Sequence, residues 1–519
     1  MSSSYFTQIG SDIDGETTDD SSGWSVSLSS DGKVVAIGAT HNDANGNSSG
    51  HVRVYKNVNG TWMKEGSDID GDVAEDELGY SVSLSSDGKV VAIGAHQNDT
   101  GRGYVRIYKN IDNNWIQAGG DIDGKALGDN SGRSVSLSSD GDVVAIGEIL
   151  AEASGSSNGQ VRIYKNINDN WSQIGNDIVG EDAMSFSGRS VSLSSDGSIV
   201  AIGADWNDGN GTHSGHVRIY KNVDNTWIQI GDDIDGEASG DRSGWSVSLA
   251  ADGSVVAVGA PRNDGNGIDS GHVRIYKNVD NTWIQIGDDI DGEASEDTFG
   301  ISVSLSADGS IIAIGSHQND ENGSDSGHIR IYKNSDDNWI KVGSDIGGEA
   351  SGDGFGISVS LAADGSVVAV GAPRNDGNGI DSGHVRIYQI DLDTTAPSAP
   401  SLLLTSSLAS DNTPTITGTA EAGSTVTLYS GSISDNKTIT YYVSVEAKTE
   451  EHNSYSSGSS FGYKINNNFA PNLSLTPGST YIFDQSDSSN LNHPLLFYLD
   501  SNKTNSYQEN VISRGTPGT

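Results

Sequence analysis

Four acidic side chains recur with one spacing along this chain, at positions 1, 3, 5 and 9 of a repeated segment. A turning segment brings alternate side chains to one centre, and carboxylate oxygens at such offsets suit Ca²⁺. The spacing therefore predicts calcium sites. Their predicted ligands are Asp12, Asp14, Glu16, Asp20, Asp68, Asp70, Asp72, Asp76, Asp233, Asp235, Glu237, Asp241, Asp289, Asp291, Glu293 and Asp297.

Other copies of this acidic segment depart from the spacing. Lys125 takes position 5 in the third copy, Val179 and Ser185 interrupt the fourth, and Gly347 takes position 3 in the seventh. Glycine also stands at position 4, whereas a calcium loop usually turns at position 6. The alternative is an acidic connector anchored on the protein by the isoleucine at position 2, which is Ile13, Ile69, Ile234 or Ile290.

The acidic segments belong to a longer repeat. The phrase Ser-Val-Ser-Leu, two small residues, then Asp-Gly occurs seven times, with its aspartate at Asp31, Asp87, Asp140, Asp196, Asp252, Asp308 and Asp364. The steps between copies are 56, 53, 56, 56, 56 and 56 residues. A period of this size marks a solenoid, a propeller or an array, in which neighbouring copies must pack on each other.

One copy predicts four antiparallel strands. Residues 246–249 alternate small polar and apolar side chains, residues 255–260 are nearly all apolar, and residues 272–276 alternate again. An Asp-Gly turn separates the first two runs, and the tryptophan run at 227–231 supplies a fourth strand. Seven units of four strands predict the blades of a β-propeller.

The ends of the repeat distinguish a closed propeller from an open β-solenoid. The seventh copy has no tryptophan strand after Tyr388, whereas residues 6–10 at the start of the chain match residues 227–231. We therefore expect an all-β protein with a seven-bladed β-propeller closed by the N-terminal strand, because closure hides both sheet edges. Small β-sandwich modules are expected to follow.

Two motifs in the repeat resemble a known family. Phe299-Gly300 and Phe355-Gly356, with Gly-Ala-Pro at 259–261 and 371–373, are similar to FG-GAP repeats, the propeller blades of integrin α-subunits and of many bacterial surface proteins. The resemblance spans residues 5–392. The family's calcium loop, Asp-x-Asp-x-Asp-Gly between the first two strands, is replaced here by a short Ser-Ser-Asp-Gly turn. The family's metal site is therefore not expected at that place.

Two further positions recur at the third strand of each copy. Histidine begins this strand at His51, His216, His272, His328 and His384, but Tyr104 and Gln160 replace it in the second and third copies. One histidine per blade would be too far from the next to share one ion, so we expect packing or loop bonding. Arginine occurs two residues before the strand's tyrosine in every copy. It is expected to be paired or stacked between blades, because an unpaired buried charge is costly.

The composition limits the classes of partner that the protein is expected to bind. The net charge of −42 disfavours nucleic acid and anionic membranes, since both would be repelled. No apolar run is long enough to insert in a membrane, and the N-terminus lacks the pattern of a signal peptide. Cysteine is absent, which excludes disulfides and thiolate metal sites.

The region after the repeat predicts further modules. Residues 393–400 form a Pro/Thr-rich linker, and residues 401–438 contain a stretch that resembles part of a bacterial Ig-like domain. Residues 439–519 resemble a cupredoxin-like sandwich module, without the Cys and Met that a copper site would add to His493. No final strand follows, so we expect the natural protein to continue beyond Thr519.

These observations favour an extracellular or cell-surface protein that recognises a glycan or a protein through the acidic loop face of the propeller. On this face the acidic segments and the loops between the second and third strands are expected to emerge together. There is no His-Glu-x-x-His motif and no Gly-x-Ser-x-Gly nucleophile elbow, which requires a strand before the motif and a helix after it, so we expect no catalysis. The alternatives are a polysaccharide hydrolase or lyase and a structural spacer of a surface layer. An enzyme would need copies that break the repeat with acids, bases or aromatics, whereas copies three and four deviate toward Ser, Ala and Gly.

If the acidic segments bind Ca²⁺, a millimolar concentration of the ion will raise the thermal unfolding temperature, because a ligand that binds only the folded state stabilises it. Differential scanning calorimetry with Ca²⁺ and with a chelator measures the shift, and Mg²⁺ serves as the control. An unchanged transition would argue for the connector.

Overall fold

The computed structural model describes residues 5–97, 101–152 and 156–392, together with short strands beyond residue 400. All regular elements among these residues are strands. The described residues include no helix that is long and apolar enough to cross a membrane. The chain divides into two compact units, residues 1–395 and residues 396–519.

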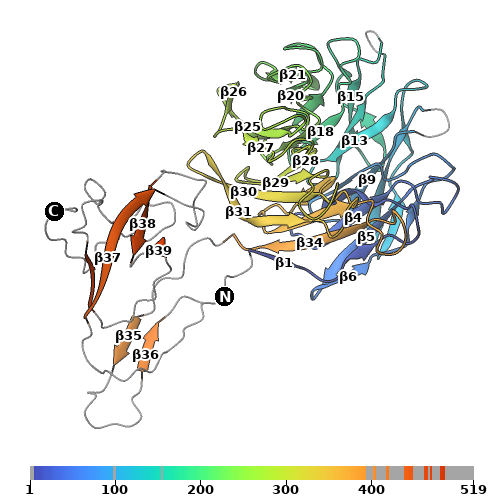
Figure 1. Ribbon diagram of the computed structural model, residues 1–519. Helices are drawn as coiled ribbons and strands as arrows, with labels where there is room; N and C mark the ends of the chain where they lie inside the picture. The colour runs from blue at the N-terminus through green and yellow to red at the C-terminus, as the bar shows by residue number, and fades with distance from the viewer. Residues whose placement is uncertain are drawn as a thin grey trace. The chain divides into compact units, whose positions relative to one another are not determined.

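The first unit is a seven-bladed β-propeller, as the repeat predicts (Figure 1). Its innermost strands are β3 (Ser22–Leu28), β8 (Ser81–Leu84), β13 (Ser131–Leu137), β18 (Ser190–Leu193), β23 (Ser246–Leu249), β28 (Ser302–Leu305) and β32 (Ser358–Leu361). The second strands are β4 (Val34–Ala39), β9 (Val90–Ala95), β14 (Val143–Glu148), β19 (Ile199–Ala204), β24 (Val255–Ala260), β29 (Ile311–Ser316) and β33 (Val367–Ala372).

The outer half of each blade carries the remaining strands. The third strands are β5 (His51–Val58), β10 (Tyr104–Ile111), β15 (Gln160–Asn166), β20 (His216–Val223), β25 (His272–Val279), β30 (His328–Ser335) and β34 (His384–Ile390). The outermost strands are β6 (Thr61–Lys64), β11 (Asn114–Gln117), β16 (Trp171–Gln173), β21 (Thr226–Gln229), β26 (Thr282–Gln285), β31 (Asn338–Gly347) and β1 (Phe6–Gln8).

The N-terminal strand closes the ring. Strand β1 pairs antiparallel with β34 of the seventh blade, with Phe6 opposite Ile390 and Gln8 opposite Tyr388. The first strand of the chain thus completes the last blade, as the match between the two ends of the repeat predicts. Strand β34 therefore has a paired strand on both sides, as the third strands of the other blades do.

The acidic segments begin inside the blades and not in free loops. In six blades their positions 2 and 3 form a two-residue strand that pairs with the start of the third strand. These are β2 (Ile13–Asp14), β7 (Ile69–Asp70), β12 (Ile122–Asp123), β17 (Ile178–Val179), β22 (Ile234–Asp235) and β27 (Ile290–Asp291). In the sixth blade the long strand β31 covers the same stretch with one irregularity in its register.

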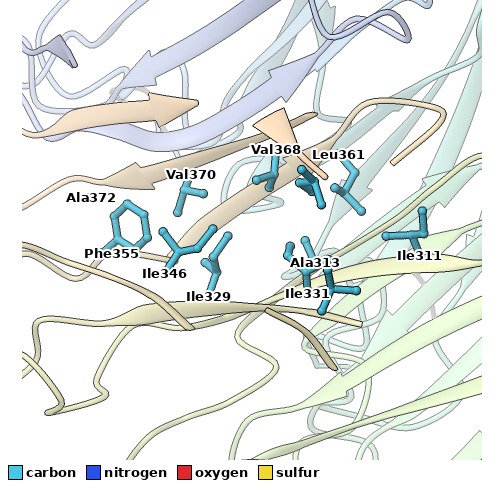
Figure 2. Packing of buried hydrophobic residues seen from close by; sticks show 12 residues of the cluster. Ile311, Ala313, Ile329, Ile331, Ile346, Phe355, Leu361, Val368, Val370 and Ala372 are labelled. Carbon is cyan, nitrogen blue, oxygen red and sulfur yellow. The ribbon is translucent and has the colours of Figure 1, made fainter. Parts of the chain in front are cut away.

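The hydrophobic core lies between blades. Every residue of β4 is buried, and alternate side chains enter opposite interfaces. Val34 and Ala36 pack with the second blade, whereas Val35 and Ile37 pack with the seventh. Figure 2 shows the equivalent interface of blades six and seven, where Ile329 and Phe355 lie against Val370. This two-sided burial explains the nearly continuous apolar run of the second strands.

A repeated contact joins each blade to the next at the axis. The first serine of each Ser-Val-Ser-Leu donates a hydrogen bond to the carbonyl of a glycine in the following blade, as Ser25 does to Gly79 at 2.7 Å. The last bond of the series, from Ser358 to Gly23 at 2.8 Å, returns to the first blade. The seven bonds form a closed circle. A second circle links the other serine to a leucine N–H, as from Leu28 to Ser360.

Glycine is required on both sides of this contact. A Cβ on Gly259 would lie 2.2 Å from the carbonyl oxygen of Gly300, which is backbone and has no freedom to move aside. Gly300 itself has φ of +89°, a conformation that other residues rarely adopt. The equivalent pairs recur in every blade.

The second unit contains two described sheets. Strand β35 (Ser401–Leu404) pairs with β36 (Ile416–Thr419). Strands β39 (Asn468–Phe469), β38 (Phe461–Ile465), β37 (Thr438–Ala447) and β40 (Thr480–Asp484) form the other in that order, with β37 and β40 parallel. The predicted linker, His493 and most of the Ig-like and cupredoxin-like modules lie outside the described residues. Both modules stay predictions.

Replacing Gly259 with alanine will destabilise the propeller by about 1–3 kcal/mol, because the added methyl group must displace backbone. Gly120→Ala is the matched control, since a Cβ there meets nothing within 4 Å and its backbone is unstrained. Urea unfolding followed by tryptophan fluorescence compares the two variants. Equal stabilities would show that the glycine contact does not constrain the blades.

Candidate functional site

One residue from each blade lines a cavity on the propeller axis. It directly precedes Ser-Val-Ser-Leu and follows the glycine of the blade-to-blade contact. The seven residues are Trp24, Tyr80, Arg133, Arg189, Trp245, Ile301 and Ile357. All seven line a cavity of about 490 Å³. The cavity opens at the end of the blades where the second-to-third-strand loops emerge, the face that the sequence analysis selected.

The second-to-third-strand loops complete the lining. They contribute Pro261 and Arg262 from the fifth blade, and His317 and Gln318 from the sixth. Thr298 is the remaining lining residue. Among the described residues that line this cavity there are three arginines and no carboxylate. The cavity is therefore a positive region in a chain whose net charge is −42.

Aromatic rings hold two of the arginines. The guanidinium carbon of Arg189 lies 3.6 Å from the ring centroid of Trp245, and that of Arg133 lies 4.4 Å from the centroid of Tyr80. Trp24 packs against Tyr80 with a centroid distance of 5.6 Å. Such cation–π contacts favour the charged form of each guanidinium and restrict its orientation.

The two arginines repel each other. Burial and, after it, the charge of Arg133 lower the pKa of Arg189 to about 10. Asp205 is 1% exposed, and neither of its carboxylate oxygens has a hydrogen-bond partner, although Nη1 of Arg242 lies 3.6 Å from its Oδ2. Burial raises the pKa of Asp205, although the charges of Arg189, Arg242 and Arg133 oppose that effect. An anion in the cavity would therefore relieve repulsion that the protein only partly compensates.

Sequence reasoning missed this cavity. It judged copies three and four to deviate toward Ser, Ala and Gly, but these copies supply Arg133 and Arg189. One feature of the sequence could have indicated it. The residue between the repeated glycine and the first serine of Ser-Val-Ser-Leu differs among the seven copies, although both of its neighbours are the same in every copy. Its importance depends on the closed ring, which brings all seven side chains to one place.

The predicted calcium ligands occupy different surroundings within one segment. Position 9 is buried: Asp20, Asp76, Asp241 and Asp297 are at most 4% exposed. The carboxylate of Asp20 accepts hydrogen bonds from the backbone N–H groups of Glu16 and Thr17, at 2.9 and 2.7 Å. The Asn42 side chain donates to it as well. This aspartate caps its own segment.

The other acidic positions have separate partners. Position 3 lies in the two-residue strands, and the carbonyl of Asp235 accepts a hydrogen bond from Arg274 at 2.7 Å. Position 5 pairs with the same arginine: Glu237 lies 3.4 Å from it. At position 1, Asp233 accepts a hydrogen bond from Gln229 at 2.6 Å. The isoleucine at position 2 is buried in all four segments that fit the spacing, as the connector hypothesis expects.

The acids that do converge come from successive segments. Five groups of His and carboxylate atoms within 4.8 Å of one another are found among the described residues, and none contains two acids of the same segment. Four of them join a position-5 acid, the histidine of the third strand and the position-1 acid of the next segment; Glu321 replaces the position-5 acid in the sixth blade. Calcium binding by single segments stays a prediction.

The histidines of the third strand are buried and neutral. His51, His216, His272 and His328 are each 1% exposed. Burial lowers their pKa to about 4, with the neighbouring arginine adding to the effect. The arginines are paired between blades, as expected: Arg53 donates to the carbonyl of Asp14 at 2.7 Å.

Sequence comparison gives one family match. The profile described as the FG-GAP repeat matches residues 234–276, 290–332 and 347–388. The chain carries FG-GAP repeats. Each match runs from an acidic segment, through the axial residue, to the third strand of the blade that follows. No curated protein sequence matches the chain.

Solved structures with a related arrangement are distant in sequence. A putative 6-phosphogluconolactonase from Bacteroides uniformis ATCC 8492 has 15% identity and a TM-score of 0.45, covering 63% of this chain and 86% of its own. The periplasmic gluconolactonase PpgL of Pseudomonas aeruginosa has 14% identity, the same TM-score, and coverages of 63% and 85%. U3-55K has 11% identity, a TM-score of 0.45, and coverages of 74% and 98%.

These comparisons correct one expectation. The sequence analysis expected a protein without catalysis, whereas two of the similar structures carry the names of lactonases, which are hydrolases. The absence of His-Glu-x-x-His and of a nucleophile elbow was a poor criterion, because hydrolytic sites do not require either feature. At 14–15% identity the likeness transfers no activity to this chain.

Because of the buried histidines, we expect the free energy of unfolding to depend on pH. The folded pKa of His51 lies at about 4, below its ordinary value of 6.5. Between these values the unfolded chain binds a proton that the folded chain does not, so stability falls as pH falls through this window. His51→Gln will remove this contribution, and the loss of stability from about pH 7 to about pH 4.5 will shrink by about 2 kcal/mol.

Gln is the matched replacement because Gln160 begins the third strand of the third blade. Urea unfolding at a series of pH values, with a chelator present, measures the difference. Parallel pH profiles for the two proteins would contradict a depressed histidine pKa.

Proposed function

We propose that this FG-GAP propeller is a binding protein whose axial cavity takes an acidic sugar at the end of a glycan. The observation that supports it is the lining: three arginines and three aromatic side chains, without a carboxylate among the described lining residues, in a strongly acidic protein. The proposal keeps the loop face chosen from the sequence but moves recognition from the acidic loops to the axis.

The lining suits both parts of such a ligand. A guanidinium presents paired N–H donors that match a carboxylate or sulfate. The faces of Trp24 and Trp245 offer flat apolar surfaces to the C–H face of a sugar ring. A volume of about 490 Å³ falls within the range of small-ligand sites and holds one or two sugar units.

The surrounding charge adds selectivity. The acidic segments lie outward of the cavity and repel a long polyanion, whereas a single acidic terminal unit meets the arginines. This arrangement favours a glycan with an isolated charged end over a continuous polyuronate. We also propose an extracellular or cell-surface location, which the resemblance to surface propellers supports.

Arg133→Gln/Arg189→Gln will weaken binding of glycans that end in uronic or sialic acid by roughly 100-fold or more, since each charge-assisted hydrogen bond contributes about 1.5–3 kcal/mol and the double variant removes the bonds of two arginines. A glycan array of acid-terminated chains and their neutral counterparts identifies the ligand, and isothermal titration calorimetry measures the change. Lys33→Gln/Lys89→Gln controls for the loss of two positive charges, because both lysines lie exposed beside Asp-Gly turns.

The wild-type protein is expected to retain acid-terminated glycans and not the neutral ones. Absence of any acid-dependent binding, or equal affinity in the double variant, would refute the axial site.

A further inference from the structure

The outer edge of the propeller has seven equivalent junctions. Each junction comprises position 5 of one acidic segment, the residue that begins the third strand, and position 1 of the next acidic segment. In the fifth blade these are Glu237, His272 and Asp289, and in the fourth they are Glu181, His216 and Asp233. Each set offers three ligand atoms within 4.8 Å of one another.

In the fifth junction each carboxylate turns one oxygen toward the imidazole. Oδ1 of Asp289 accepts a hydrogen bond from Gln285, and Oε1 of Glu237 faces Arg274. The other oxygens, Oδ2 and Oε2, lie 3.8 and 4.0 Å from Nδ1 of His272. These separations are too long for hydrogen bonds. They are close to the distance between two atoms that coordinate one ion.

His272 itself is unsatisfied. It is 1% exposed, and its Nε2 has no hydrogen-bond partner. The Nε2 atoms of His51, His328 and His384 also have no partner, so the feature that points to an ion is Nδ1 of His272, which is directed at two carboxylate oxygens beyond hydrogen-bond distance. In the fourth junction Nδ1 of His216, also 1% exposed, lies 3.5 Å from Oδ2 of Asp233.

In the two junctions without histidine, a positively charged side chain pairs with the carboxylates. In the second junction Arg106 bridges the two acids, donating to Asp72 and, through two nitrogens, to Asp121. In the third junction position 5 is itself a cation, and Lys125 pairs with Asp177. In both places a positive group of the protein holds the position-1 acid.

The fourth and fifth junctions have no such bridge. Arg218 and Arg274 pair there with the position-5 glutamate, at 3.1 and 3.4 Å, and no ion pair with Lys or Arg is found for Asp233 or Asp289 in the described part of the chain. The other three histidine junctions differ in this respect. Lys64 pairs with Asp68 in the first, Arg330 with Asp345 in the sixth, and Arg386 with Asp12 in the seventh.

We propose that the fourth and fifth junctions each bind one divalent transition-metal ion of the zinc class. The ligands are Nδ1 of His216 with oxygens of Glu181 and Asp233, and Nδ1 of His272 with oxygens of Glu237 and Asp289. Imidazole with carboxylates suits zinc better than calcium, which takes oxygen ligands. Zinc–ligand bonds of about 2.0–2.2 Å place donors about 3.3 Å apart. The ligand atoms of each junction lie within 4.8 Å of one another, so the side chains must close by up to about 1.5 Å.

The glutamates have the freedom for this closure, since Glu181 and Glu237 are about half exposed. These sites are distinct from the calcium sites predicted within single segments, because they combine acids of two segments with a histidine. They are also independent of the axial cavity. Zinc would join the third strand of one blade to the acidic segment that precedes this blade and to the acidic segment that follows it.

The test uses the full chain, stripped with a chelator and dialysed against micromolar free Zn²⁺ before elemental analysis. The wild-type protein will bind two more Zn²⁺ ions than His216→Gln/His272→Gln. Glutamine is the residue that the third blade carries at this position, so the variant keeps a side chain the fold accommodates. Unfolding in chelator confirms that both proteins are folded.

Two further measurements make the result specific. His213→Gln, in a loop of the fourth blade where the ring contacts Trp206, controls for loss of any histidine and will bind as many ions as the wild type. Co²⁺ absorption in the visible range will report the imidazole–carboxylate site in the wild type and be lost in the double variant. Equal zinc content in wild type and double variant would overturn the proposal. Calcium binding unaffected by the histidine changes, without zinc binding, would overturn it as well and favour the single-segment sites.

Discussion

The propeller depends on one contact, in which a serine hydroxyl of one blade meets a glycine carbonyl of the next directly above a second glycine. The carbonyl of Gly300 accepts from Ser246 at 2.8 Å and lies where a Cβ of Gly259 would be. The two glycine motifs of the repeat are thus the two halves of one joint. Because the series of seven closes on itself, an added atom at any joint must displace backbone in a ring that has no free end.

This joint also makes the axial cavity possible. The residue after each joint glycine faces the axis from a backbone that the ring holds in the same place in every blade. Its side chain is therefore free to differ, and the seven copies carry Trp, Tyr, Arg or Ile there. A rigid scaffold with variable positions beside it is the arrangement that binding sites use, since preorganised side chains lose little entropy when a ligand arrives. Repetition serves packing, and the departures from it form the proposed binding site.

Charge is separated within the same scaffold. The carboxylates gather in the acidic segments at the outer junctions, where strand arginines neutralise part of their charge. The cavity keeps arginines against aromatic rings with Asp205 as a buried counter-charge. The junctions show that the same acids accept different cations. Arg106 bridges two of them in the second blade, Lys125 pairs with Asp177 in the third, and a neutral histidine lies beside two of them in the fourth and the fifth. A positive partner stabilises a pair of carboxylates at close range, and the protein supplies one in the second blade but not in the fourth or the fifth.

The repeat, its strands, the seven blades and the closing role of residues 6–10 could all be read from the sequence, because period and alternation are local properties that burial enforces on every copy. The anchoring isoleucines and paired arginines followed for the same reason. The sequence did not indicate that Arg133 and Arg189 both line the cavity at the axis. It also predicted that Glu237 shares an ion with Asp233, whereas the structure brings Glu237 close to Asp289. Those neighbours are separated by about one repeat or more along the chain, and only closure of the ring and the crossing from blade to blade bring them together.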